Sequence, residues 1–294
     1  GDQWWASIAL APIGSTEAPP TEMSLAKGLP DAALDRIANF HAKAQDVSSR
    51  SFLRLQKTLF AEQERETLIH LREAKSIELV LKQGDRLFDP AEWARRWQSR
   101  GRPVYVQVLL EAAQSEINAF DLGIAFDLTA PPVRSWLQDR IALWSTLVNE
   151  ETGRLIAQEV AAGREAGESI PQIQTRISNV FAVAQGYRAE RIARTETQGA
   201  SNRAALEAYQ QSEVVQEKRW LSTLDERTRP FHLEAHGQTV PLDQPFEVGG
   251  ELIMHPGEGS PGNSINCRCS LAPVVRTGRR AIISHNGREP SRVA

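Results

Sequence analysis

Residues 223–236 read Thr-Leu-Asp-Glu-Arg-Thr-Arg-Pro-Phe-His-Leu-Glu-Ala-His, and this stretch sets the expected structure of the C-terminal third. Pro230 suits the first turn of a short helix, because a first-turn residue needs no amide hydrogen. On that helix His232 and His236, four residues apart, would share one face. Gly237 is a natural end for the helix, since glycine readily adopts the left-handed conformation. We therefore expect a short helix that carries both histidines.

The segments around this stretch predict short strands, long loops and one longer helix. Residues 214–222 alternate well enough for a strand, and residues 238–241 predict a second. A region rich in glycine and proline follows and ends at Ile265-Asn266-Cys267-Arg268-Cys269-Ser270-Leu271. On the N-terminal side, residues 187–211 predict a helix. Residues 187–275 are therefore expected to form a small, loop-rich α+β domain.

Residues 31–186 are predicted to form a mainly helical region. Apolar residues recur at helical spacing over residues 31–82, 90–119 and 131–163, and again after Pro171. Gly101 and Pro103 predict an interruption of the second helix. No obvious chemistry lies in this region, so its histidines and aromatic residues are interpreted as packing residues. The fold class is α+β, a mainly helical N-terminal region followed by the small C-terminal domain.

Composition limits the possible classes of function. A chain of 294 residues is long for one core and favours more than one domain. Charged residues make up 24%, which is ordinary for a globular protein, and no apolar run approaches the length of a transmembrane helix, so no membrane partner is expected. The net charge of −3 argues against nucleic-acid binding by the chain as a whole. Two cysteines exclude a disulfide framework and indicate a reducing compartment.

The two histidines of the quoted stretch and the two cysteines form a candidate metal site. The four residues are His232, His236, Cys267 and Cys269. Two imidazoles and two thiolates suit tetrahedral zinc, although Cys-x-Cys is tighter than the usual spacing of zinc ligands. In the alternative interpretation, the same residues form a hydrogen-bonded cluster without metal that ties the loops together.

Polar residues on the predicted helix at 187–211 need partners if that face is buried. An unpaired buried polar group costs a few kcal/mol, so the partners should come from the segments that follow. We expect one structural polar cluster, composed of Arg194, Glu196, Asn202, Asp225, Arg227 and Asn266.

The order and spacing of several rare residues in this third resemble one protein family. They are Arg194-Thr195-Glu196 with Asn202, then Trp220, Asp225, Arg227, His232 and Gly237, then Phe246, Pro256 and Asn266-Cys267-Arg268-Cys269. The resemblance is to the phage Mu F-like head morphogenesis family, the minor head proteins of tailed phages and prophages, and it covers residues 187–275. The preceding helical region has no motif of its own.

The resemblance implies a virion or procapsid component that is assembled in the bacterial host cytoplasm. It implies portal and capsid or scaffold proteins as partners, and a role in head morphogenesis and DNA packaging or delivery near the portal. Residues 2–14, with Trp4-Trp5 and Pro12, look like the end of a phage portal protein. Residues 1–30 are therefore expected to be a linker or portal-like tail, and the chain to be the C-terminal part of a portal–minor head fusion.

Two further hypotheses concern chemistry rather than scaffolding. Residues 276–294 are expected to form a basic flexible tail, whose Arg276, Arg279 and Arg280 could contact the phosphates of double-stranded DNA. Alternatively, the chain is a metal-dependent enzyme or effector domain in a phage particle, with Glu196, Asp225, His232 and Cys267 supplying acid, base and nucleophile. No established catalytic motif supports the enzyme hypothesis, so a non-enzymatic protein is preferred.

Overall fold

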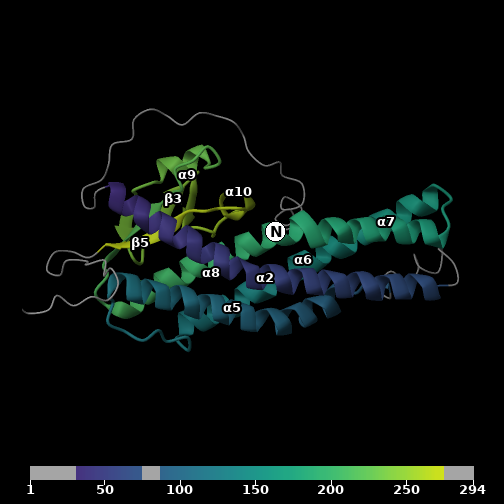
Figure 1. Ribbon diagram of the computed structural model, residues 1–294, viewed down its shortest axis with the longest axis horizontal. Helices are drawn as coiled ribbons and strands as arrows, with labels where there is room; N and C mark the ends of the chain where they lie inside the picture. Colours follow the sequence, from purple (N-terminus) through teal and green to yellow (C-terminus); the bar gives the residue numbers. More distant parts are fainter. Residues whose placement is uncertain (1–30, 75–86, 275–294) are drawn as a thin grey trace, which may run out of the picture.

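The computed structural model describes residues 31–74 and 87–274, so the linker 1–30 and the basic tail 276–294 lie outside the described residues. Its long helices lie side by side along the longest axis, and the small strands gather toward one end (Figure 1). The long helices are α2 (Asp31–Glu73), α5 (Pro90–Phe120), α6 (Pro131–Glu165), α7 (Ile170–Val183) and α8 (Ala189–Ser212). The predicted α+β class is confirmed.

Aromatic side chains form the centre of the helical bundle. Phe52 of α2 meets Tyr105 of α5 with ring centroids 4.7 Å apart, and Trp97 meets Trp144 of α6 at 5.0 Å. Phe60 packs edge-on against Trp97. All five side chains are fully buried. Aromatic pairs with this geometry stabilise the core beyond the burial of their area, so the interpretation of these residues as packing residues is consistent with the structure.

The predicted interruption of the second helix is wrong, because α5 continues through Gly101 and Pro103. Gly101 faces Trp144, and a Cβ atom there would lie 2.4 Å from the indole ring. The glycine therefore allows α5 and α6 to approach closely at this point. Buried Trp97 and Tyr105 hold the helix on both sides of Pro103, so tertiary packing overrides the local preference against proline in a helix.

A short π-helix joins α7 to α8. This element, η1 (Ala184–Arg188), contains Gly186 with a non-helical ψ of −116°. The buried guanidinium of Arg188 donates to the carbonyl oxygen of Val148 and to the hydroxyl of Thr152, 2.9 Å in each case. The bend at Gly186 lies at the boundary between the predicted helical region, residues 31–186, and the predicted C-terminal domain.

The C-terminal unit is built from short strands and two short helices. Its elements are β1 (Glu217–Leu221), α9 (Pro230–Glu234), β2 (Thr239–Pro241), β3 (Phe246–Val248), β4 (Glu251–Ile253), α10 (Pro261–Ser264) and β5 (Ser270–Val274). One antiparallel sheet has the order β2-β1-β5, and β3 and β4 form a separate hairpin. Gly249 and Gly250 turn this hairpin with positive φ angles of 60° and 77°, which glycine adopts without strain.

The helices and the C-terminal unit share a boundary. Leu34 and Ile37 of α2 pack against Leu221 of β1 and Ala272 of β5. Helix α8 also contacts β5. The sheet is thus covered by helices from distant parts of the sequence. Within the described residues, no helix has both the length and the apolar character that a membrane span requires.

Candidate functional site

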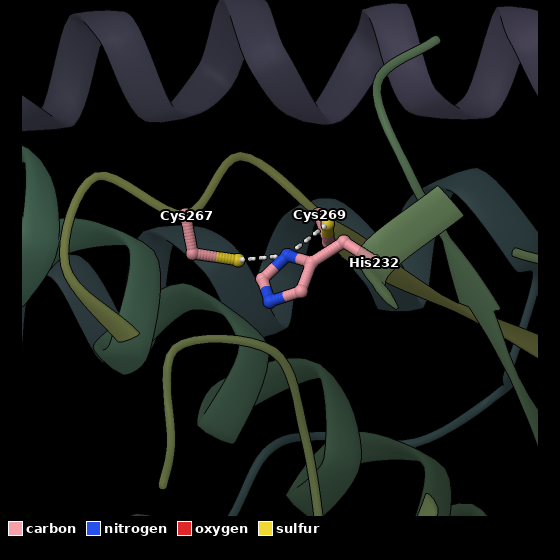
Figure 2. Close-up of side chains that lie close together, drawn as sticks. All are labelled: His232, Cys267 and Cys269. Atoms are coloured by element: carbon pink, nitrogen blue, oxygen red, sulfur yellow. Dashed lines mark hydrogen bonds between the residues drawn. The ribbon is translucent and has the colours of Figure 1, made fainter. Parts of the chain in front are cut away.

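His232, Cys267 and Cys269 meet in the interior of the C-terminal unit. The histidine lies on α9, and the cysteines lie between α10 and the start of β5. The Nδ1 atom of His232 is 3.8 Å from Sγ of Cys267 and 3.3 Å from Sγ of Cys269. Figure 2 shows the imidazole directed at both sulfur atoms. All three ligand atoms lie within 4.8 Å of one another, and all three residues are buried.

Asn263 fixes the protonation of the imidazole. Its Nδ2 atom donates to the carbonyl oxygen of Val248 at 3.2 Å. That bond turns its Oδ1 atom toward Nε2 of His232, 3.0 Å away. Since Oδ1 can only accept, Nε2 carries a proton, and in the neutral ring Nδ1 is then the unprotonated nitrogen. The lone pair of Nδ1 therefore faces the two sulfur atoms, which is the arrangement of a metal-binding histidine supported by an outer hydrogen bond.

The surroundings of the two thiols shift their pKa values in opposite directions. The hydrogen bond with Cys269 is the main cause that lowers the pKa of Cys267 well below its usual range, and the interaction with His232 lowers it further. Burial raises the pKa of Cys269 well above its usual range. The hydrogen bonds to Asp225 are the main cause of the raised pKa of Arg268, and attraction to the sulfurs of Cys269 and Cys267 adds to it. The pair therefore holds one negative charge more readily than two.

Polar side chains of α8 hold the backbone that carries the cysteines. The side chain of Gln198 donates to the carbonyl oxygen of Cys269, and Nδ2 of Asn202 donates to the same oxygen at 3.1 Å. Oγ1 of Thr195 accepts from the amide of Asn266 at 3.2 Å. All three side chains are buried. Residues 266–269, which we call the cysteine segment, are therefore fixed to helix α8 rather than left as a free loop.

Asn202 also completes the edge of the sheet. β5 is an outer strand in the order β2-β1-β5, so its outward amides have no strand partner among the residues that the structure describes. Oδ1 of Asn202 accepts from the amide of Leu271 at 3.2 Å. An unpaired buried amide costs about 1–3 kcal/mol. The asparagine thus takes the place of a neighbouring strand at that position.

An ion pair holds the cysteine segment from the other side. The two terminal nitrogens of Arg268, Nη1 and Nη2, donate to Asp225, each at 2.5 Å. Asp225 also accepts from the amide of Arg227 at 3.0 Å. The hydroxyl of Thr223 donates to the carbonyl oxygen of Arg268 at 3.0 Å. These bonds tie the loop before α9 to the segment between the cysteines.

The structure brings together three of the four residues of the predicted metal site. Helix α9 ends at Glu234, so the expected helix does not extend to His236. The Nδ1 atom of His236 instead accepts from the amide of Ser222 at 3.0 Å. His236 thereby supports Ser222, the residue that follows β1, and the hydroxyl of Ser222 donates to the carbonyl oxygen of His232.

The predicted polar cluster is divided among three places. Asn266 is part of the cysteine segment, Asn202 and Asp225 bond to that segment, and Arg227 lies 3.5 Å from Asp225. Glu196 points into the helical bundle and pairs with Arg140, while the hydroxyl of Tyr105 donates to it at 2.5 Å. Arg194 is exposed and pairs with Glu190 one turn away. The tail residues Arg276, Arg279 and Arg280 lie outside the described residues.

Sequence reasoning missed Asn263, Gln198 and Arg140. Asn263 lies 31 residues from His232 and in no motif, so only the three-dimensional structure connects them. Gln198 is four residues before Asn202 on the same helix, and this spacing could have indicated a shared face.

In comparisons with known proteins, residues 154–272 match one family, which is described as Phage Mu protein F like protein. The Minor head protein GP7 of Bacillus phage SPP1 is 29% identical over 124 residues, which are 41% of this chain and 40% of that protein. The Uncharacterized protein YqbB of Bacillus subtilis is 25% identical over 195 residues, 64% of either chain.

A third relative has an enzymatic name. The NAD(+)--arginine ADP-ribosyltransferase EFV of Enterococcus faecalis is 31% identical over 130 residues, 43% of this chain and 26% of that protein. The chain thus spans between 26% and 64% of the lengths of these three relatives. No solved structure matches the chain significantly.

The Asp225–Arg268 pair predicts a stability that depends on pH. Hydrogen bonding from Arg268 lowers the pKa of Asp225 below its usual range. The unfolded state therefore takes up a proton first as the pH falls. The stability that the pair contributes is present above about pH 4, the ordinary value for Asp, and is lost as the pH falls further toward the folded pKa. Asp225→Asn should cost about 1–2 kcal/mol at pH 7.

Urea unfolding of both proteins across a pH series measures this effect. The difference between them should be constant from about pH 8 to pH 5 and should narrow below about pH 4. Arg227→Gln is the control, because that guanidinium is 62% exposed and 3.5 Å from Asp225; its cost should stay within about 0.5 kcal/mol. If the difference in unfolding free energy between the wild type and Asp225→Asn does not change with pH, the stabilising role of the Asp225–Arg268 pair is contradicted.

Proposed function

We propose that this chain, whose residues 154–272 match the Phage Mu protein F like family, is a minor head protein of a tailed phage or prophage. The observation that carries the proposal is where the match lies. It includes α8, strands β1 and β2, the first residues of β5 and all three residues of the His-Cys-Cys cluster. The similarity to a minor head protein of a Bacillus phage supports the same role.

In this role the chain is part of the procapsid or virion, and its partners are portal and capsid or scaffold proteins. The chemistry of the described residues is that of a support rather than of a turnover site. The carboxylates of Glu196 and Asp225 are each engaged by an arginine. The chain then contributes to head assembly and to DNA packaging or delivery near the portal.

We further propose that the His-Cys-Cys cluster holds zinc as a structural ion. In a tetrahedral zinc site, sulfur and nitrogen ligands lie about 3.6 Å apart, close to the 3.8 and 3.3 Å that separate Nδ1 from the two sulfurs. The outer bond from Nε2 to Asn263 leaves Nδ1 as the metal ligand. When bound, zinc would add folding free energy to a small, loop-rich unit.

The alternative, a metal-dependent enzyme or effector, has one observation in its favour. One relative is named as an arginine ADP-ribosyltransferase, but the match covers 26% of that protein. Among the four residues considered for catalysis, Glu196 lies with Arg140 and Tyr105, apart from the His-Cys-Cys cluster. We therefore prefer the structural role.

The head-protein role predicts a specific association during assembly. When the full chain is produced together with the portal, capsid and scaffold proteins of its phage, it should co-purify with portal complexes or procapsids in low copy. Quantitative mass spectrometry of the purified particles measures this ratio. Particles assembled without portal are the control, and they should contain less of the chain. Its absence from both portal complexes and procapsids would reject the role.

The zinc proposal predicts about one metal ion per chain by elemental analysis of the purified protein. Cys267→Ser and His232→Gln should lose the metal, because each removes a ligand. His236→Gln is the matched control, since its Nδ1 atom accepts from the amide of Ser222 and it lies outside the cluster; it should retain the metal. Metal-free wild-type protein, or retention in Cys267→Ser, would refute the site.

A further inference from the structure

A pocket of about 600 Å³ opens beside the cysteine segment. Its walls come from α2, from η1 and α8, and from the loops at residues 223–229 and 266–268. The volume lies in the usual range for pockets that bind small ligands. Five arginines line it, namely Arg191, Arg194, Arg227, Arg229 and Arg268. We call it the arginine pocket.

Positive charge exceeds negative charge on these walls. Asp46 and Glu226 are the acidic residues in the lining. Two more acids lie close by, since Asp225 pairs with Arg268 and Arg227, and Glu190 pairs with Arg194. The five arginines thus outnumber the four acids, and each guanidinium carries more donors than one carboxylate occupies. The pocket is therefore suited to an oxyanion that accepts several hydrogen bonds at once.

Two of the arginines contact neutral groups, among other neighbours. Nη2 of Arg229 donates to the carbonyl oxygen of Ile265 at 2.5 Å. The guanidinium of Arg191 lies over the ring of Tyr187, 4.3 Å from its centroid. Burial and the neighbouring charge of Arg194 both lower the pKa of Arg191. Two like charges are thus held close together, and a bound anion would relieve this cost.

Polar atoms in the wall also lack partners among the described residues. Thr197 is 1% exposed, and its hydroxyl makes no hydrogen bond in the part of the chain that the structure describes. The same holds for Oδ1 of Asn266. Both residues line the arginine pocket. A buried hydroxyl without a partner is costly, so a ligand oxygen near Thr197 and a ligand N–H near Asn266 would satisfy both groups.

We propose that the arginine pocket binds one phosphate-bearing nucleotide unit. The guanidinium groups and the Thr197 hydroxyl would receive the phosphate, the amide oxygen of Asn266 would accept from the base edge, and Tyr187 offers an aromatic ring nearby. The shared chemistry is a phosphate with an attached base, supplied by a free nucleotide or by a single strand. This site goes beyond the proposed head-protein role and does not depend on it, nor on the hypothesis of a DNA-binding tail.

Titration of the full chain with ADP and with a short fluorescent single-stranded oligothymidylate tests the proposal. Arg194→Glu should weaken binding of the probe that binds at least about tenfold, which corresponds to roughly 1.4 kcal/mol. Its side chain is 58% exposed, so the fold should tolerate the change. Arg154→Glu is the matched control, because Arg154 is 52% exposed and likewise pairs with a glutamate on its own helix. It should bind as the wild type does.

A second variant addresses the pocket without changing charge. Thr197→Val keeps the shape of the side chain and removes the hydroxyl, so it should weaken binding several-fold while thermal unfolding stays close to the wild type. Binding of ADP identifies a free nucleotide as the source, and binding of the oligothymidylate alone identifies a strand. The proposal is overturned if neither probe binds the wild type, if Arg194→Glu has no effect, or if Arg154→Glu weakens binding equally.

Discussion

The C-terminal unit depends on the hydrogen bonds between α8 and the cysteine segment. Gln198 and Asn202 both donate to the carbonyl oxygen of Cys269, and Thr195 accepts from the amide of Asn266. These are buried bonds between a regular helix and an irregular backbone. Because unpaired buried amides and carbonyls are costly, the loop has one favourable position on the helix. That position puts both sulfur atoms beside His232.

The remaining contacts act on a segment that α8 has already placed. The ion pair from Asp225 to Arg268 holds it from the side opposite the helix, and Asn263 orients the imidazole that faces the sulfurs. Such a small sheet buries little apolar surface by itself. Polar contacts, together with the zinc ion that we propose, would supply the order that a larger core otherwise provides. The arginine pocket lies on the same segment, so the candidate metal centre and the candidate nucleotide site share one support.

The sequence allowed the helical region and strands β1 and β2 to be predicted, because apolar periodicity and turn residues are local signals. The short strands β3, β4 and β5 lie in a stretch that was predicted only as loop-rich. The continuity of α5 through Pro103 could not be predicted, since it depends on Trp97 and Tyr105 packing against other helices. His232 and the two cysteines were predicted to meet from their ligand types. The position of His236 depends on where α9 ends, and that of Glu196 on Arg140, 56 residues earlier in the sequence. Neither position can be predicted from the neighbouring residues in the sequence.

Native-state hydrogen exchange at the amide of Leu271 tests most directly whether α8 holds this segment. That amide donates to the side chain of Asn202 and not to a neighbouring strand. It should exchange only through global unfolding in the wild type, and Asn202→Ala should speed its exchange by orders of magnitude more than that of amides within β1. Rapid exchange of Leu271 in the wild type, or unchanged exchange in Asn202→Ala, would contradict a segment held by the helix.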